Sequence, residues 1–315
     1  MPNGISPTRL PSRSRLRLPA GWRGLAGLAG LVPVVALLGM AGCASRPQQP
    51  APSVYPRPFQ IIAHRGASAR APENTLPAFR AARRLGAVEV ELDVQLSADD
   101  QVILFHDGLL EPKTGRPGTV RDHSLASLRE MEIGSWFDAS HPEADERFAG
   151  TKLTTLADLF AEMGRDFVYH VELKDGEADL SARVLEVVDR FALRDRVIVT
   201  SFRFEQLARM RALAPELPTC LLILDDARRE GSVADWIARA DAAGMREVGV
   251  TAREIAPEHV ADAHARGLWI RAWGIKSLDD MQHAIDVGSN GMTIDWPEEL
   301  IRRFLEFQGS AGAER

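Results

Sequence analysis

Carboxylates and basic side chains alternate with apolar residues in two segments that otherwise have the pattern of a buried β-strand. One segment covers residues 88–94 and the other covers residues 167–174. The polar side chains are those of Glu89, Glu91, Asp93, His170, Glu172 and Lys174. Burying an unpaired carboxylate is costly, so folding alone does not favour this arrangement. Metal binding or catalysis would explain it, and the alternative is a sheet with one solvated face.

Three of these side chains, Glu91, Asp93 and Glu172, favour a hard divalent cation. The sequence has no run of cysteines and histidines at the spacing of a zinc site, whereas Ca²⁺ and Mg²⁺ prefer oxygen ligands. We therefore predict one bound cation, either Ca²⁺ or Mg²⁺, and the sequence does not decide between the two.

Two histidines are placed to carry protons beside such a cation. His64 follows the first apolar run, and His106 follows the apolar run 102–105, which we expect to fold back on the preceding strand through a turn near residues 98–100. This hairpin would bring His106 beside Asp93. Imidazole can accept or donate a proton near neutral pH, so the pair suits a general base and a general acid.

Two basic side chains suit an anionic phosphoryl group. Arg65 follows His64 directly, and a guanidinium can hold a phosphate through two parallel hydrogen bonds. Lys174 follows the second acidic segment and would neutralise charge that develops on phosphoryl oxygens. Carboxylates, histidines and basic residues together describe metal-assisted cleavage of a phosphodiester.

Alternating strand and helix patterns predict an α/β fold, a (β/α)8 TIM barrel. Barrel strands are expected at residues 60–63, 88–94, 167–173, 197–201, 219–224, 246–250, 269–274 and 291–294. Helices are expected at residues 75–85, 154–163, 178–191, 203–213, 257–266 and 277–287. Such a barrel gathers its active site at the C-terminal ends of the strands. A doubly wound open sheet is the alternative, but no Gly-x-Gly-x-x-Gly motif follows the first strand.

The predicted hairpin and residues 108–150 interrupt this order after the second strand. Residues 108–150 contain glycines, prolines, aromatic residues and mixed charges, and they fit no strand–helix unit. Long insertions of this kind are often functional. We expect the insertion to pass over the barrel mouth and to influence the choice of substrate.

The first 42 residues resemble a bacterial lipoprotein signal. Five arginines and no acidic residue precede an apolar run at 25–42, which ends in small residues before Cys43. We expect Cys43 to be lipidated and to become the mature N-terminus, and the alternative is a transmembrane anchor of marginal length. Residues 43–58 contain five prolines and would form an extended linker. Together these features predict export and a lipid anchor in the membrane, on the periplasmic face of the outer membrane.

Removal of the leader would make the protein strongly acidic. Five of the 38 lysines and arginines lie in the leader, which leaves 33 against 44 aspartates and glutamates. A domain of this charge lacks the basic surface that nucleic acid requires, so we expect no nucleic-acid partner. The length of residues 59–307 suits a single catalytic domain, followed by a polar tail at 308–315.

Several short motifs occur together in this chain: His64-Arg65-Gly66, Pro72-Glu73-Asn74-Thr75, Glu91-x-Asp93, His106-Asp107, Glu172-x-Lys174 and Trp273. In order and spacing they resemble the glycerophosphodiester phosphodiesterase family over residues 60–300. The resemblance implies a TIM barrel with the hairpin and insertion described above. It also implies a role for each matching residue: cation ligands at Glu91, Asp93 and Glu172, base and acid at His64 and His106, phosphate contacts at Arg65 and Lys174, and a glycerol contact at Trp273.

The activity that this resemblance implies is metal-dependent hydrolysis of a glycerophosphodiester to an alcohol and sn-glycerol 3-phosphate. In that chemistry the glycerol 2-hydroxyl of the substrate can attack phosphorus, giving a cyclic phosphate that water later opens. After His106-Asp107 the chain reads Gly-Leu-Leu-Glu-Pro-Lys-Thr-Gly, where the family commonly has an Arg-Thr-Thr type sequence. The identity of the small-molecule substrate therefore stays open.

Two alternatives remain. A lysophospholipase D would use the same site on a substrate that keeps one acyl chain. An apolar groove in the insertion, with Trp136, Phe137 and Phe148, would favour that activity. A protein that only binds phosphate esters would need neither a general acid nor a general base, so the pair His64 and His106 argues against it.

Overall fold

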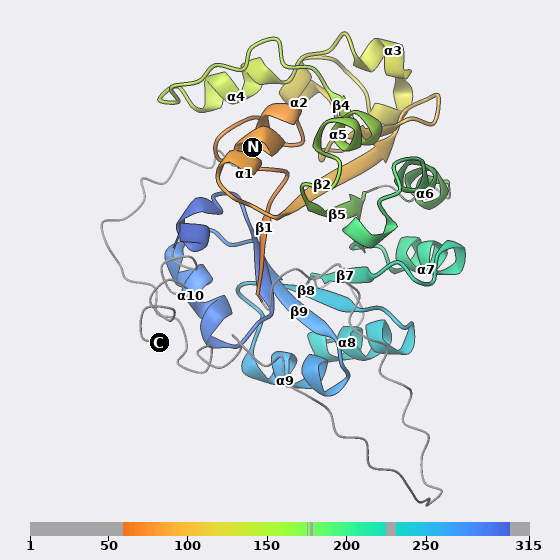
Figure 1. The fold of residues 1–315 in the computed structure, drawn as a ribbon, viewed down its shortest axis with the longest axis vertical. Coiled ribbons are helices and arrows are strands. Elements are labelled where there is room, and N and C mark those ends of the chain that lie inside the picture. Colours follow the sequence, from red (N-terminus) through yellow and green to blue (C-terminus); the bar gives the residue numbers. More distant parts are fainter. Residues whose placement is uncertain (1–58, 175, 177–178, 225–230, 303–315) are drawn as a thin grey trace, which may run out of the picture.

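Eight parallel strands close into a barrel at the centre of the molecule (Figure 1). The computed structural model describes residues 59–302 apart from 175, 177–178 and 225–230. In order around the ring, the strands are β1 (Gln60–Ala63), β2 (Glu89–Leu96), β5 (Val168–Leu173), β6 (Val197–Ser201), β7 (Thr219–Ile223), β8 (Glu247–Thr251), β9 (Trp269–Trp273) and β10 (Gly291–Ile294). β1 pairs in parallel with both β10 and β2, which closes the ring. The predicted TIM barrel is confirmed, and the open-sheet alternative is wrong.

Helices surround this barrel on its outer side (Figure 1). They are α1 (Leu76–Arg84), α5 (Leu156–Met163), α6 (Leu180–Arg190), α7 (Phe204–Leu213), α8 (Val233–Ala242), α9 (Pro257–Ala265) and α10 (Leu278–Asp286). A short 3-10 turn, Arg194–Arg196, precedes β6. Helix α8 was not among the predicted helices, although Ser232 and Asp235 form a capping box at its start.

Strand β2 directs its apolar and its acidic side chains to opposite faces of the sheet. On β2, Val90, Leu92 and Val94 belong to the apolar core that also includes residues of the outer helices. The alternating side chains, Glu91 and Asp93 among them, are therefore directed to the barrel interior. They are almost completely buried there, which rules out the alternative of a solvated sheet face.

The predicted hairpin after the second barrel strand is present. β2 turns back into β3 (Val102–Leu104) in an antiparallel pair, with Val94 opposite Leu104. β4 (Thr154–Thr155) then pairs with β3. Helix α5 consequently begins at Leu156, two residues later than predicted, because Thr155 serves as its N-cap.

The chain between β3 and β4 has short helices and a small apolar core of its own. The helices are α2 (Glu111–Thr114), α3 (Leu125–Leu128) and α4 (Gly134–Ser140), with a 3-10 turn at Val120–Asp122. Its apolar core contains Phe105, Leu110, Val120, Leu128, Met131 and Ile133. Figure 1 shows this insertion at the top of the view, beyond β2 and α5.

Several predictions concern residues that the structure does not describe. The signal segment 1–42, Cys43, the linker 43–58 and the tail 308–315 all lie outside the described residues. Within the described ranges, no helix combines the length and the apolar character needed to cross a bilayer.

Candidate active site

The predicted cation ligands converge at the C-terminal end of the barrel strands. Glu91 and Asp93 lie on β2, and Glu172 lies on the neighbouring strand β5, where the parallel register sets Asp93 opposite Glu172. One carboxylate oxygen from each of the three residues lies within 4.8 Å of those of the other two. The barrel therefore forms a candidate acidic metal site from these three side chains.

The electrostatics of this cluster fit a divalent cation. Burial raises the pKa of Glu91 well above its usual value, and the carboxylates of Asp93 and Glu172 raise it further. Burial and Asp93 also raise the pKa of Glu172, against the opposing effect of Lys174. Among the described residues, Oε1 of Glu91 has no hydrogen-bond partner although it is buried. A cation would satisfy this oxygen and relieve the repulsion among the carboxylates.

Asp93 is held in its ionised form by its neighbours. Burial alone would raise the pKa of Asp93, but the charges of Arg65 and Lys174 bring it well below its usual value. Arg65 Nε lies 3.1 Å from Oδ2 of Asp93, and Lys174 Nζ lies 3.5 Å from Oδ1. Asn74 donates to Oδ2 over 2.8 Å and accepts from the Asp93 amide over 3.1 Å. Asn74 belongs to a motif quoted above, but its role as an orienting residue was not predicted.

His64 is oriented by an aspartate that directly follows the last barrel strand. Nδ1 of His64 lies 2.5 Å from Oδ1 of Asp295, and Nε2 lies 3.8 Å from Oε2 of Glu91. His64 and Arg65 lower the pKa of Asp295 despite its burial, so the ionised carboxylate can only accept and Nδ1 must carry the proton. Burial and Arg65 lower the pKa of His64, which leaves Nε2 as an acceptor near neutral pH.

His106 has a matching carboxylate partner next to it in sequence. Nδ1 of His106 lies 2.7 Å from Oδ1 of Asp107. Burial opposes ionisation of Asp107, but the hydrogen bond from His106 and the charge of Lys113 lower its pKa to about 2. The His106 side chain is about one-third exposed, at 32%. The imidazole is therefore accessible to a ligand at the barrel mouth, where it lines a cavity.

Arg65 and Lys174 are both engaged by carboxylates of the site. Arg65 Nη1 donates to Glu73 over 2.9 Å, while its amide donates to Oε2 of Glu91 over 3.1 Å. Lys174 Nζ lies 2.9 Å from Oε1 of Glu172. The predicted phosphate contacts thus also hold the cation ligands in place.

Lys113 was not predicted to belong to the site. Its Nζ lies 2.7 Å from Oε1 of Glu73 and 3.0 Å from Oδ2 of Asp107. Glu73, Asp107 and His106 form a second cluster with metal-ligand types, but here the ammonium of Lys113 already supplies a cation. Burial would raise the pKa of Glu73, yet Arg65 and Lys113 together hold it below its usual value.

Trp273 ends β9 at the same rim. Its ring packs edge-on against Phe202, with centroids 5.2 Å apart, and Phe202 was not predicted. Nε1 of Trp273 is buried and has no acceptor among the described residues. A Cβ at Gly249 would lie 2.7 Å from Leu222 and 3.4 Å from Trp273, so the glycine leaves room for the indole.

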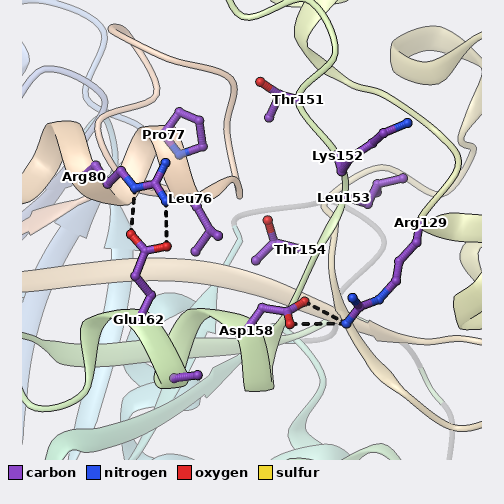
Figure 2. Close-up of a pocket in the computed structure, with 11 residues that line it drawn as sticks. Leu76, Pro77, Arg80, Arg129, Thr151, Lys152, Leu153, Thr154, Asp158 and Glu162 are labelled. Atoms are coloured by element: carbon purple, nitrogen blue, oxygen red, sulfur yellow. Dashed lines mark hydrogen bonds and ion pairs between the residues drawn. The ribbon is translucent and has the colours of Figure 1, made fainter.

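Two cavities differ in their relation to these residues. One of about 410 Å³ is lined by His106, Lys174, Gln95, Thr119, Arg121 and Arg203, and it opens beside the predicted general acid. The other, of about 760 Å³, lies between α1, α5 and residues 151–154. Figure 2 shows that its walls carry the ion pairs Arg80–Glu162 and Arg129–Asp158. None of the predicted site residues lines the larger cavity.

Comparisons with known proteins point to one family. The Glycerophosphoryl diester phosphodiesterase family matches residues 64–299. A glycerophosphodiester phosphodiesterase of Caldanaerobacter subterraneus subsp. tengcongensis is 31% identical over 247 residues, which cover 76% of this chain and 96% of that protein. A glycerophosphodiester phosphodiesterase of Bacillus subtilis is 28% identical over 246 residues, covering 75% and 83%.

Solved structures show the same similarity. A putative glycerophosphoryl diester phosphodiesterase of Silicibacter pomeroyi superposes with a TM-score of 0.70 at 25% identity, covering 79% of this chain and 94% of that one. An Oleispira antarctica phosphodiesterase, solved in complex with the product sn-glycerol-3-phosphate, gives a TM-score of 0.68 at 26% identity, covering 77% and 95%. The chain therefore belongs to the glycerophosphoryl diester phosphodiesterase family.

Proposed function

We propose that the protein hydrolyses glycerophosphodiesters to an alcohol and sn-glycerol 3-phosphate at the C-terminal end of its barrel. One observation carries the proposal: three buried carboxylates cluster at the barrel end that also carries two histidines, and the Nδ1 atom of each histidine faces an aspartate. Membership of the family supports the reaction class. The product bound to the Oleispira antarctica relative supports the nature of the product.

Glu91, Asp93 and Glu172 would hold the cation. Its identity is proposed as Mg²⁺ or Ca²⁺, because both take carboxylate oxygens as ligands. When bound, the cation would withdraw electron density from the phosphoryl group and stabilise the charge that develops there.

His64 is proposed as the general base. With Nδ1 protonated toward Asp295, Nε2 can accept the proton of the glycerol 2-hydroxyl as that oxygen attacks phosphorus. The new P–O bond forms as that proton moves to Nε2. Asp295 stabilises the imidazolium that results. When water later opens the cyclic phosphate, Nε2 returns this proton to the 2-oxygen as its bond to phosphorus breaks.

His106 is proposed as the general acid. Its Nε2 would donate a proton to the oxygen of the departing alcohol as the bond from that oxygen to phosphorus breaks, so that the alcohol leaves neutral. In the second step the neutral imidazole would take a proton from the attacking water, which restores the acid. Arg65 and Lys174 lie close enough to the carboxylate cluster to share the remaining negative charge of the phosphoryl group.

A water-soluble headgroup suits the cavity beside His106 better than an acyl chain does. Gln95, Thr119, Arg121 and Arg203 give the cavity a polar lining. Phe137 and Phe148, which would favour a lysophospholipase D if they lined a groove, are buried in a cluster with Ala71 and Ala78. We therefore propose glycerophosphodiesters rather than lysophospholipids as substrates.

We propose in addition that Cys43 carries a lipid anchor and that the mature protein faces the periplasm from the outer membrane. The lipoprotein-like signal in the sequence supports this. Cys43→Ser should abolish palmitate incorporation in growing cells and release the protein from the membrane fraction. Equal labelling of the variant would contradict the proposal.

The test of the activity is release of glycerol 3-phosphate from glycerophosphocholine by the purified protein. We expect release with added Mg²⁺ or Ca²⁺, none with excess chelator, and a loss of about 10²- to 10⁴-fold for His64→Ala and for His106→Ala. Arg129→Ala, in the wall of the larger cavity, serves as the control and should behave like the wild type. Unchanged turnover in both histidine variants would refute their assignment.

A further inference from the structure

The side chain of Lys113 connects the insertion to the catalytic rim. Lys113 lies in α2, and its side chain is only 8% exposed. A lysine is rarely buried without paired carboxylates, because its ammonium is strongly hydrated in water. Here Nζ contacts Glu73 and Asp107, and both of these carboxylates contact predicted site residues.

Asp107 joins Lys113 to the predicted general acid. Its Oδ2 lies 3.0 Å from Nζ of Lys113, while its Oδ1 lies 2.7 Å from Nδ1 of His106. The Asp107 side chain is 29% exposed, so water could solvate it in another rotamer. The ammonium therefore favours the one rotamer in which Asp107 also faces His106.

Two aromatic rings also contact the ammonium of Lys113. Nζ lies 4.8 Å from the ring centroid of Trp136 and 5.9 Å from that of Phe105. Trp136 belongs to α4 and packs against the cluster of Phe137 and Phe148. Cation–π attraction and packing thus hold Lys113 in the position where it meets Asp107.

We propose that Lys113 is a positioning residue for protonation of the leaving group. It fixes Asp107, and Asp107 in turn fixes the His106 ring with the Nδ1 proton toward the carboxylate and the Nε2 proton toward the departing alcohol. This inference rests on the proposed function. It gives the insertion a part in the chemistry that is separate from any contact with the substrate.

An effect of Lys113 on Arg65 would give a different kinetic result. Lys113 also contacts Glu73, which accepts from Arg65 over 2.9 Å. If Lys113 acted mainly through Arg65, or only supported the fold, its loss would affect every phosphodiester equally. If it acts through His106, its loss should matter most where the leaving group needs a proton.

The test compares two substrates that share the glycerophosphoryl group. Glycerophosphocholine releases an aliphatic alcohol that needs protonation, whereas glycerophospho-p-nitrophenol releases a phenolate that leaves without it. We expect Lys113→Met to lower kcat about 10- to 100-fold for the choline ester and to change that of the nitrophenyl ester much less. Lys113→Arg should restore most of the loss, since a guanidinium can also bridge two carboxylates.

Lys152→Met is the matched control, because Lys152 also lies between β3 and β4, is exposed, and donates from its ammonium to the carbonyl of Glu130. It should leave both substrates unaffected. Equal losses on the two substrates in Lys113→Met, or no loss on either, would overturn the inference. A wild type inactive on both substrates would instead refute the proposed function.

An NMR measurement that does not depend on turnover also tests whether Lys113 positions the His106 ring. At a pH high enough for the His106 ring to be neutral, its ¹⁵N shifts should report a single Nδ1-protonated tautomer in the wild type, because Asp107 accepts at that atom. In Lys113→Met we expect a mixture of tautomers, with thermal unfolding confirming that the variant is folded. An unchanged single tautomer would overturn the inference even if activity fell.

Discussion

His64 and Asp295 meet where the last barrel strand closes against the first, with Nδ1 2.5 Å from Oδ1 across 231 residues of sequence. The carboxylate fixes the tautomer of the imidazole, so Asp295→Asn should lower kcat by about 10²-fold while the protein remains folded. Steady-state kinetics with glycerophosphocholine measures kcat of the wild type and of the variant, and thermal unfolding checks that the variant is folded.

Ser68→Ala provides the control for Asp295→Asn. The Ser68 hydroxyl donates to the same Oδ1 over 3.2 Å. Its loss should change kcat by no more than about twofold. Equal losses in the two variants would mean that the hydrogen-bond environment of Asp295, rather than its charge, matters.

Local sequence patterns were sufficient to predict β2 and its buried acids. Alternation over residues 88–94 is a period-two signal, and the short gap before residues 102–105 leaves room only for a hairpin. The backbone amide of Phe105 donates to the Asp93 carbonyl over 3.1 Å, and this pairing brings the chain at His106 back to the rim. The predicted neighbourhood of Asp93 and His106 followed from these two local features.

Other parts of the site depend on contacts that no local pattern reports. Asp295 follows a short strand at the opposite end of the chain, and only closure of the barrel brings it to His64. Asp295 directly follows a predicted barrel strand, and this position was the signal that could have identified it as a site residue. Lys113 lies in a segment without periodicity, and its burial depends on Trp136 from another helix. Phe137, which would favour a lysophospholipase D if it lined a groove, instead packs in a buried cluster.

The carboxylate cluster should bind its cation with release of protons. Burial and mutual repulsion raise the pKa of both Glu91 and Glu172, so the metal-free cluster keeps protons at a pH where free carboxylates have lost them. A cation binds the ionised form. At about pH 6 we expect a net proton release per cation that falls as the pH rises. Calorimetric titration in two buffers of different ionisation enthalpy measures it.

Glu172→Gln removes one source of that release. This variant should bind the cation more weakly and release fewer protons than the wild type at the same pH. Cation binding to the wild type without any proton release would show that Glu91 and Glu172 are already ionised in the metal-free protein.

Gly66 should tolerate no side chain. Its φ is +79°, and a Cβ there would lie 2.7 Å from the carbonyl carbon of Ala78 in α1. Gly66→Ala should therefore lower the free energy of unfolding by about 2–3 kcal/mol, from the left-handed backbone and the clash together. Gly115→Ala is the control, since its φ is +68° with no atom within 4 Å, and should cost about 1 kcal/mol. Urea unfolding compares the two, and equal losses would show that α1 moves aside.

Below the catalytic rim, the barrel interior holds a charged pair in place of the usual apolar filling. Arg271 is fully buried, with Nε 3.6 Å from Oε2 of Glu247, and it also donates to the hydroxyl of Thr293. Gln60 donates to the other oxygen of Glu247 over 3.0 Å. Removing one member of such a pair leaves the other charge uncompensated.

Arg271→Met should therefore destabilise the protein by about 3–5 kcal/mol, more than the lost contacts alone would predict. In Arg271→Met/Glu247→Gln no charge is left unpaired, and Gln60 can still donate to the new amide oxygen, so we expect the double variant to regain part of that stability. Urea unfolding of the wild type, Arg271→Met, Glu247→Gln and the double variant completes a double-mutant cycle. Its coupling free energy measures the interaction between Arg271 and Glu247. A coupling near zero would mean that water reaches Glu247 in the single variant and screens its charge.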